Sequence, residues 1–312
     1  MAGILARSAV EDEVFGLNSE KCSSESSLHE YTQARLLRGE PVVTKIASWC
    51  LKHNQRRHGK KATLAVIYFD TGADADEYLF IKAIVAARAG VGYEEYKLSP
   101  HAPIEDVLAQ ITELNDDDRI HGVLIQRPIP KHLCETQVMA SVVPIKHIEE
   151  FSVEKSNNIA YDGLYRLLRS YGRAWMLDLD VVLLGGTNII TPGFRSQLRR
   201  QHKHVGALQT LDPIPQGSKY DTIIITELNK GGIIKPHMLG PSVRLVVDLG
   251  FDVKSKVGDL DPEVLDMDDL DVVPTPHGVL PVLLWTMMER TIKARDHLVR
   301  PRLHCLPDCV ML

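Results

Sequence analysis

Residues 122–130 read Gly-Val-Leu-Ile-Gln-Arg-Pro-Ile-Pro, and this stretch is the clearest indication of the fold class. A short, continuous apolar run of this kind is typical of a strand that is buried on both faces of a parallel sheet. Pro128 and Pro130 halt the strand, because proline has no backbone N–H to donate to a neighbouring strand. Gln126 therefore lies at the carboxyl end of a buried strand, which is the edge where open α/β sheets bind ligands.

The segments before this strand alternate between strands and helices. Residues 64–69 form another continuous apolar run, and residues 93–97 predict a second short strand. Helices are expected over residues 76–89, where Gly90 ends the pattern, and over residues 104–114. A β-α-β-α-β order implies a parallel sheet with helices on both of its faces.

The second half of the chain repeats this alternation and is typical of a doubly wound, Rossmann-type domain. Short apolar strands are expected at residues 181–184, 207–208, 222–225, 245–247 and 272–273. Residues 164–175 are amphipathic, a helix follows from about Phe194, and a last helix spans 282–295. The predicted fold class is α/β with two domains, an N-terminal parallel catalytic domain and a Rossmann-type domain. The expected division is a polar extension 1–30, an N-terminal domain 31–150 completed by the C-terminal helix 281–297, a Rossmann-like domain 151–280 and a tail 298–312.

Composition excludes several classes of protein. The 312 residues carry a net charge of -5 with a pI of about 6.2, so direct readout of a nucleic acid is not expected. No apolar run reaches the roughly 20 residues that a membrane-spanning helix needs. The five cysteines are scattered and form no Cys-x-x-Cys pair, which argues against a disulfide scaffold and against a zinc site. We expect no metal and a reducing compartment.

The two ends of the chain leave its location open. Residues 1–15 make a poor signal peptide and an indifferent mitochondrial presequence, although a weak or internal import signal is compatible with them. The expected location is the mitochondrial matrix or the cytoplasm. The last four residues, from Cys309 to Leu312, fit a prenylation motif. A chance match on a loose tail is the favoured explanation, because the motif is short and no dense polybasic run precedes it.

Tyr78 and Lys82 are the first candidate catalytic pair. They are four residues apart on a predicted helix, so their side chains project from one face. If the site excludes water, the lysine pKa falls and its amine becomes a proton shuttle. The alternative is a surface helix whose lysine extends into solvent.

A proline-rich loop before the last helix is a second candidate. Residues 273–281 read Val-Pro-Thr-Pro-His-Gly-Val-Leu-Pro. A rigid loop ahead of a helix N-terminus can present backbone amides to a ligand. The alternative is a plain tight connection.

Taken in order, these motifs resemble the methylenetetrahydrofolate dehydrogenase/cyclohydrolase family. The resemblance rests on Tyr-x-x-x-Lys, on Gly-Val-Leu-Ile-Gln-x-Pro-x-Pro and on the Pro-x-Pro-x-Gly-Val loop, and it runs from about Leu64 to Ile292. Residues 246–250 and 258–260 look like the family's Asp-x-Gly strand end and its Gly-Asp-Val turn.

The resemblance implies roles for individual residues. Lys82 would handle protons while water attacks the methenyl carbon of the folate. Tyr78 would stack on or orient the folate ring, and Gln126 would hydrogen-bond Lys82. Glu149 stands where the family has an aspartate that grips the pterin, and Glu150 replaces a glycine. The substrate-side loop would contribute Pro276, His277 and Gly278, in which His277 replaces a glycine, as does Leu280.

The cofactor side departs further from the family. The residues that correspond to its dinucleotide-binding turn begin Gly185-Gly186-Thr187, and Gly186 stands where the family has an arginine. Asp212 near the next strand would repel a phosphate and suit a plain ribose, so NAD is favoured over NADP if either binds.

Two functions follow from this resemblance. The first is folate one-carbon chemistry, with the cyclohydrolase step favoured over the dehydrogenase step because hydrolysis needs no nicotinamide. The second is a family member without turnover that acts as a structural or interaction subunit, for example in a mitochondrial assembly. An oxidoreductase with another substrate is a third, weaker reading. A homodimer, or membership of a larger complex, is the expected state of assembly.

Overall fold

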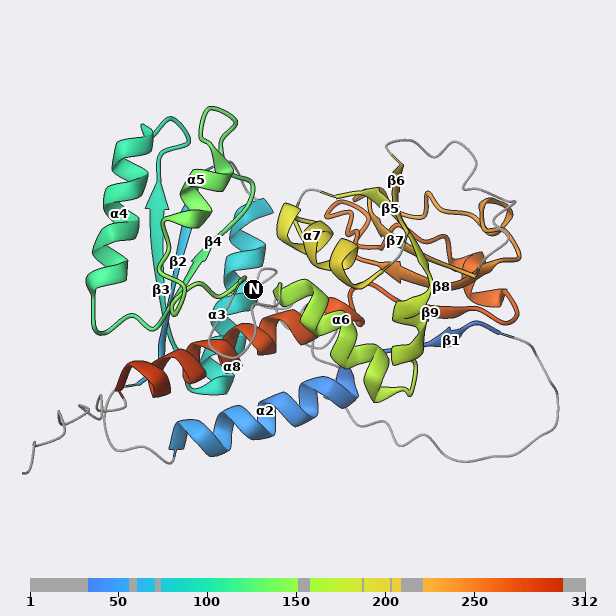
Figure 1. Cartoon of the computed structure of the whole chain (residues 1–312), viewed down its shortest axis with the longest axis horizontal. Coiled ribbons are helices and arrows are strands. Elements are labelled where there is room, and N and C mark those ends of the chain that lie inside the picture. Colours follow the sequence, from blue (N-terminus) through green and yellow to red (C-terminus); the bar gives the residue numbers. More distant parts are fainter. Residues whose placement is uncertain are drawn as a thin grey trace, which may run out of the picture.

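The computed structural model describes residues 33–55, 61–70, 74–150, 158–186, 188–202, 204–208 and 221–299. Two parallel sheets form two lobes that lie side by side (Figure 1). The predictions for the extension 1–30, for Thr187, for Asp212 and for the Cys309 motif concern residues outside the described ones.

The first lobe is built on a three-stranded sheet in the order β3-β2-β4. Its strands are β2 (Thr63–Phe69), β3 (Gly92–Leu98) and β4 (Gly122–Ile125), and all pairings are parallel. The helices α3 (Asp74–Ala89) and α4 (Ile104–Asp116) connect them. Every residue of β4 is buried, as its unbroken apolar run predicts. A short helix, α5 (Glu135–Ala140), follows β4 and was not predicted.

The second lobe is a six-stranded parallel sheet in the order β1-β9-β8-β7-β5-β6. The strands are β1 (Arg35–Leu36), β5 (Asp180–Gly185), β6 (Val205–Leu208), β7 (Thr222–Glu227), β8 (Val243–Asp248) and β9 (Asp271–Val273). The helix α7 (Pro192–Gln201) lies between β5 and β6 in the chain, and three short 3-10 helices span Ala174–Asp178, Pro236–Met238 and Pro262–Asp266. β1 was not predicted, and it places the start of the described chain in this second sheet.

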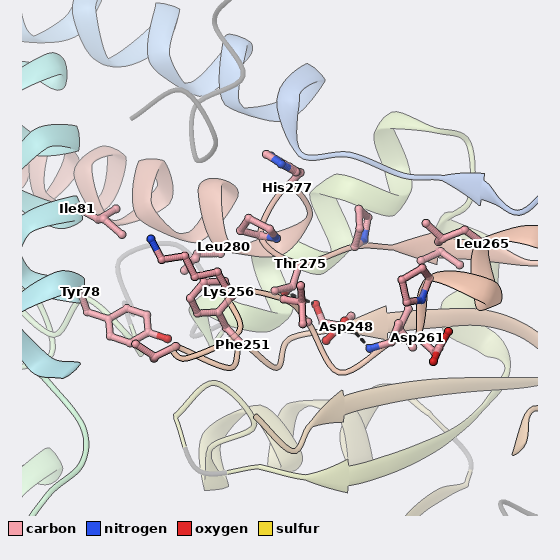
Figure 2. Close-up of a pocket in the computed structure, with 18 residues that line it drawn as sticks. Tyr78, Ile81, Asp248, Phe251, Lys256, Asp261, Leu265, Thr275, His277 and Leu280 are labelled. Carbon is pink, nitrogen blue, oxygen red and sulfur yellow. Dashed lines mark hydrogen bonds between the residues drawn. The ribbon is translucent and has the colours of Figure 1, made fainter. Parts of the chain in front are cut away.

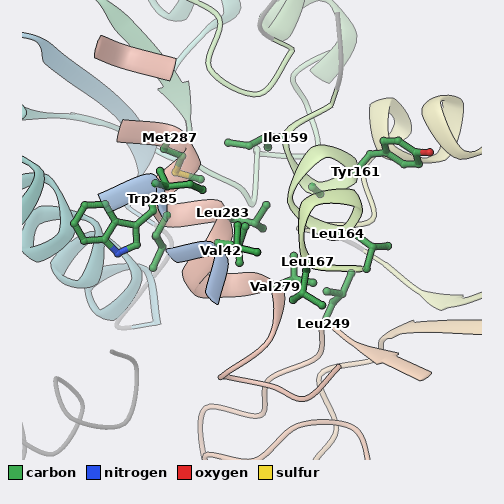
Figure 3. Close-up of a cluster of buried hydrophobic side chains, with 14 of the residues drawn as sticks. Val42, Ile159, Tyr161, Leu164, Leu167, Leu249, Val279, Leu283, Trp285 and Met287 are labelled. Carbon is green, nitrogen blue, oxygen red and sulfur yellow. The ribbon is translucent and has the colours of Figure 1, made fainter. Parts of the chain in front are cut away.

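The last helix packs against three other helices. The helix α8 (Val279–Val299) packs against α2 (Glu40–Gln55), α3 and α6 (Ile159–Ser170). Figure 3 shows their apolar side chains meeting in one cluster, with Val42 from α2, Leu164 and Leu167 from α6, and Leu283 from α8. Because α8 is buried on most of its surface, it fixes the first lobe against the rest of the molecule.

Both the α/β class and the two-sheet organisation are confirmed. Apart from the unpredicted β1 and α5, the differences lie at element ends. The helix α6 begins five residues earlier than expected, at Ile159, and the last helix begins three residues earlier, at Val279. None of the helices in the described segments has the length and apolar character that a membrane span requires.

Candidate active site

A cavity of about 720 Å³ opens between the two lobes. The first lobe contributes Tyr78, Lys82, Gln126 and Glu149 to its wall, and the second lobe contributes Glu227. The cavity lies at the carboxyl ends of β4 and β7, where open parallel sheets hold their ligands. The four residues predicted for catalysis and for the pterin therefore line one cavity.

Lys82 is buried beside this cavity. Its side chain comes from α3 and the residue is only 5% exposed. Nζ donates to the Tyr78 carbonyl at 3.2 Å, and it lies 5.7 Å from the centre of the Tyr78 ring. The four-residue spacing thus places amine and phenol ring side by side, and the alternative of a solvated surface lysine is wrong.

Burial lowers the pKa of Lys82 from 10.5 to about 8. The charged ammonium loses its hydration there, and the nearby carboxylates of Glu149 and Glu95 offset only part of that loss. A pKa near 8 leaves a substantial fraction of neutral amine at physiological pH. Neutral amine can accept a proton, so the site is suited to general-base catalysis.

Gln126 lies at the end of β4, as predicted, but its hydrogen bond is different. Its Nε2 donates to the Arg127 carbonyl at 2.9 Å, while Lys82 donates to Tyr78. The direct bond between Gln126 and Lys82 that the family resemblance implies is not formed in the described structure. In place of that bond, each of the two side chains donates to a backbone carbonyl close to it in the chain.

Glu149 is held by an arginine that was not predicted to take part. Arg127 Nη1 donates to Glu149 Oε1 at 2.7 Å, and Arg127 Nε donates to Glu135 at 2.9 Å. Arg290 of α8 fixes the backbone below by donating to the carbonyls of Ile148 and Glu149 at 2.9 and 3.1 Å. The carboxylate thus has a defined position on the cavity wall, with one oxygen engaged by Arg127.

A second cavity of about 370 Å³ adjoins the first (Figure 2). The proline-rich loop contributes Pro276 and His277 to its wall, and Leu280 lines both cavities. Gly278 does not line either cavity. It is needed for packing, because a Cβ there would collide with the carbonyl oxygen of Pro274.

The buried Asp248 also lines this second cavity. Burial and the neighbouring Asp259 carboxylate raise the pKa of Asp248 to about 7. Its oxygens accept the backbone N–H groups of Gly250 and Leu260 at 3.0 and 3.2 Å. The carboxyl group therefore ties two turns together at the end of β8.

In the turn after β5, the backbone amides of Gly186 and of residues 188–190 are all bound within the protein. The Glu227 carboxylate accepts the N–H groups of Asn188, Ile189 and Ile190, each at 2.9 Å. Gly186 donates to the Glu227 carbonyl at 3.0 Å, and Gly185 gives its carbonyl to Arg195 at 2.7 Å. The two glycines predicted to bind a cofactor are thus engaged within the protein.

Gly186 has a φ of +109°, and a Cβ at this position would collide with Ile190. A glycine is therefore required where the family has an arginine, because this backbone conformation is open only to glycine.

A second carboxylate lies at the start of α7. Glu150 accepts a hydrogen bond from the buried Asn158 at 2.9 Å, and Asn158 also reaches Thr191 at 3.5 Å. A Cβ on Gly193 would collide with Glu150, so this carboxylate lies directly against the first turn of α7. Glu150, which replaces a family glycine, thus joins the first lobe to the second.

Sequence reasoning missed Arg127, Glu227 and the contact of Glu150. A signal for Glu227 was available, because this acidic residue follows closely on the apolar run at residues 223–225, which predicts a buried strand. Buried carboxylates need partners, so a strand end of this kind predicts a hydrogen-bonded role. No sequence signal joins Glu227 to residues 188–190, which are far away in the chain.

Comparisons with known proteins agree with this architecture. The family model described as the catalytic domain of tetrahydrofolate dehydrogenase/cyclohydrolase matches residues 37–149. The bifunctional protein FolD of Campylobacter jejuni is 26% identical over 280 residues, which cover 83% of this chain and 97% of that protein. By these matches the chain is similar to the tetrahydrofolate dehydrogenase/cyclohydrolase family, over its first lobe in the family model and over most of its length in FolD.

Structures and longer relatives extend the likeness. The crystal structure of Campylobacter jejuni FolD superposes with a TM-score of 0.72 at 26% identity, over 85% of this chain and 99% of that one. The mitochondrial C-1-tetrahydrofolate synthase of Schizosaccharomyces pombe is 25% identical over 287 residues, which cover 84% of this chain and 29% of that protein.

The matched range 37–149 contains Tyr78, Lys82, Gln126 and Glu149. Glu227 lies outside this range. Across the described residues, no group of three or more His, Cys, Asp or Glu side chains could hold a metal ion.

Proposed function

We propose that this protein acts in folate one-carbon metabolism and hydrolyses a methenyltetrahydrofolate, without a nicotinamide. The observation that carries the proposal is the buried Lys82, whose amine has a lowered pKa and lies beside the Tyr78 ring on the wall of the larger cavity. The substrate's reacting carbon is part of an amidinium cation. A neutral amine is the form that tolerates such a cation nearby.

The chemistry needs a water molecule, Lys82 and the substrate. The water oxygen forms a bond to the methenyl carbon while its proton passes to the neutral Nζ of Lys82. One carbon–nitrogen bond of the resulting adduct then breaks as the Lys82 ammonium returns the proton to the departing ring nitrogen. The adduct hydroxyl loses its proton to solvent as the formyl C=O forms, so one proton is released overall. The product is a formyl-folate, and Lys82 is again neutral.

Glu149 would hold the pterin end of the substrate. Its Oε1 is paired with Arg127, and a carboxylate has further lone pairs with which to accept donors from an aminopyrimidinone edge. Arg127 is then a positioning residue, because it fixes the carboxylate that meets the substrate. Tyr78 and Gln126 complete the site as a stacking ring and a strand-end amide.

A catalytically inactive subunit is the second candidate function. It is favoured by the turn after β5, whose amides are engaged by Glu227, because this turn has been remodelled away from the family pattern. A homodimer, or a place in a larger complex in the mitochondrial matrix or the cytoplasm, is proposed for either function.

The test follows the absorbance decay of methenyltetrahydrofolate with the wild type and with Lys82→Met. Removing the general base is expected to lower the enzymatic rate by about 10²–10⁴-fold. Lys97→Met is the matched control, since Lys97 is exposed and its salt bridge is to the exposed Asp70, and it is expected to keep the wild-type rate. Equal decay with wild type and Lys82→Met would leave the inactive subunit as the function.

A further inference from the structure

We propose that the second lobe has replaced the phosphate group of a dinucleotide with its own Glu227 carboxylate, and that it therefore binds neither NAD nor NADP. This inference concerns the second lobe and does not rest on hydrolysis at Lys82. It would hold equally for an inactive subunit.

Geometry is the first argument. In doubly wound domains the turn after the first strand, leading to a helix N-terminus, presents its backbone amides to the diphosphate. Here β5 and α7 are that strand and that helix, and residues 188–190 lie in the turn between them. The amides of these residues donate to one carboxylate, with both Glu227 oxygens engaged. They are arranged for an anion, and the protein supplies that anion itself.

The second argument is burial, which fixes the Glu227 carboxylate in the turn. Glu227 is 2% exposed and ends β7, a strand whose residues are all buried, so the backbone that carries the carboxylate is fixed by the centre of the sheet. Its carbonyl also accepts the Gly186 N–H, which ties the turn to the strand a second time. A ligand would have to break these bonds before its phosphate could make them.

Charge is the third argument. A phosphate that approached the turn would meet the Glu227 carboxylate and, across the first turn of α7, the Glu150 carboxylate. Two like unit charges 4 Å apart in a protein environment repel strongly enough to weaken affinity by about a thousandfold. The amides of residues 188–190, which could offset this repulsion, already donate to Glu227. The residues present therefore do not fit a dinucleotide, and no step of the reaction is assigned to one.

The experiment measures thermal unfolding of the full chain with NAD, NADP, inorganic pyrophosphate or sodium chloride of equal ionic strength. Wild type, Glu227→Ala, Glu227→Gln and the control Glu263→Gln are compared, because Glu263 is an exposed glutamate of the same lobe. Wild type and the control are expected to show no shift with either dinucleotide or with pyrophosphate at about 1 mM, the upper end of ordinary KM values. Glu227→Ala is expected to melt at a lower temperature and to recover part of the loss with pyrophosphate but not with sodium chloride.

Saturable binding of NAD or NADP to the wild type below about 1 mM would overturn the proposal. The same holds if Glu227→Ala melts like the wild type, or if pyrophosphate gives no recovery. Should Glu227→Ala fail to fold, Glu227→Gln keeps the shape of the side chain and removes its charge, and a melting point below that of Glu263→Gln supports the proposal. The wild-type titration alone can still refute it.

Discussion

Lys82 and Glu227 are two buried charged residues on the wall of the same cavity, yet their surroundings are opposite. Glu227 accepts three backbone N–H groups, so the protein itself satisfies its charge. Lys82 has one hydrogen bond to a carbonyl, and burial lowers its pKa to about 8. Lys82 and Glu227 are both buried, so burial alone does not identify a catalytic group. A buried charged group that is fully hydrogen-bonded within the protein stabilises the fold. A buried charged group with few hydrogen bonds beside an open cavity can exchange protons with a ligand.

The largest expected effect is the dependence of the hydrolysis rate on pH, which tests the role of Lys82. Only neutral Lys82 accepts a proton, and its pKa is about 8. The enzymatic rate is therefore expected to rise about tenfold for each pH unit below 8, and to level off above it. Initial rates between about pH 6 and pH 9, corrected for spontaneous decay of the substrate, measure the profile. A rate that stays constant from pH 6 to pH 8 would remove Lys82 from the proton-transfer step.

Substitution of Lys82 and substitution of Glu227 are expected to change the free energy of unfolding by smaller amounts and in opposite directions. At pH 7 the folded protein carries the cost of a buried ammonium, so Lys82→Met is expected to raise the free energy of unfolding by about 1–3 kcal/mol. Glu227→Ala is expected to lower it by about 3 kcal/mol, because it leaves buried amides without an acceptor. Urea denaturation of both variants against the wild type measures the two changes.

The size of the lysine effect changes with pH in a defined way. The Lys82 pKa is lower in the folded protein than in the unfolded chain, so between pH 8 and pH 10.5 the unfolded chain binds more protons. Raising the pH through this window stabilises the wild type, and the advantage of Lys82→Met shrinks. A constant advantage at all pH values would mean that packing, and not charge, accounts for it.

Local patterns were enough to predict most of the fold. The unbroken apolar run of β4 and the alternation of strands and helices follow from burial on both faces of a parallel sheet. The strand β1 was missed because it has only two residues, Arg35 and Leu36, and exists through its pairing with the distant β9. A partner so far away in the chain leaves no periodic pattern in a short segment.

The candidate site divides in the same way. The placement of Tyr78 beside Lys82 follows from helix geometry, which the sequence contains. The contact of Arg127 with Glu149 joins residues 22 positions apart, and the contacts of Glu227 with the turn after β5 join residues 37 to 39 positions apart. These pairs depend on how the strands are ordered in space. The sequence shows that Glu149, Glu150 and Gly186 depart from the family pattern. Their contacts with Arg127, Asn158 and Glu227 are seen only in the folded chain.

The most direct test of the account assays both half-reactions with one preparation of the wild-type protein. Methenyltetrahydrofolate decay is followed without added dinucleotide, and reduction of NAD and of NADP is followed with methylenetetrahydrofolate as the hydride donor. We expect methenyltetrahydrofolate to decay faster than its spontaneous rate, and this rate to stay the same when NADP is added. We expect no reduction of NAD or of NADP. Reduction of NAD or NADP that depends on methylenetetrahydrofolate would contradict it, because it would require a dinucleotide in the turn that Glu227 occupies.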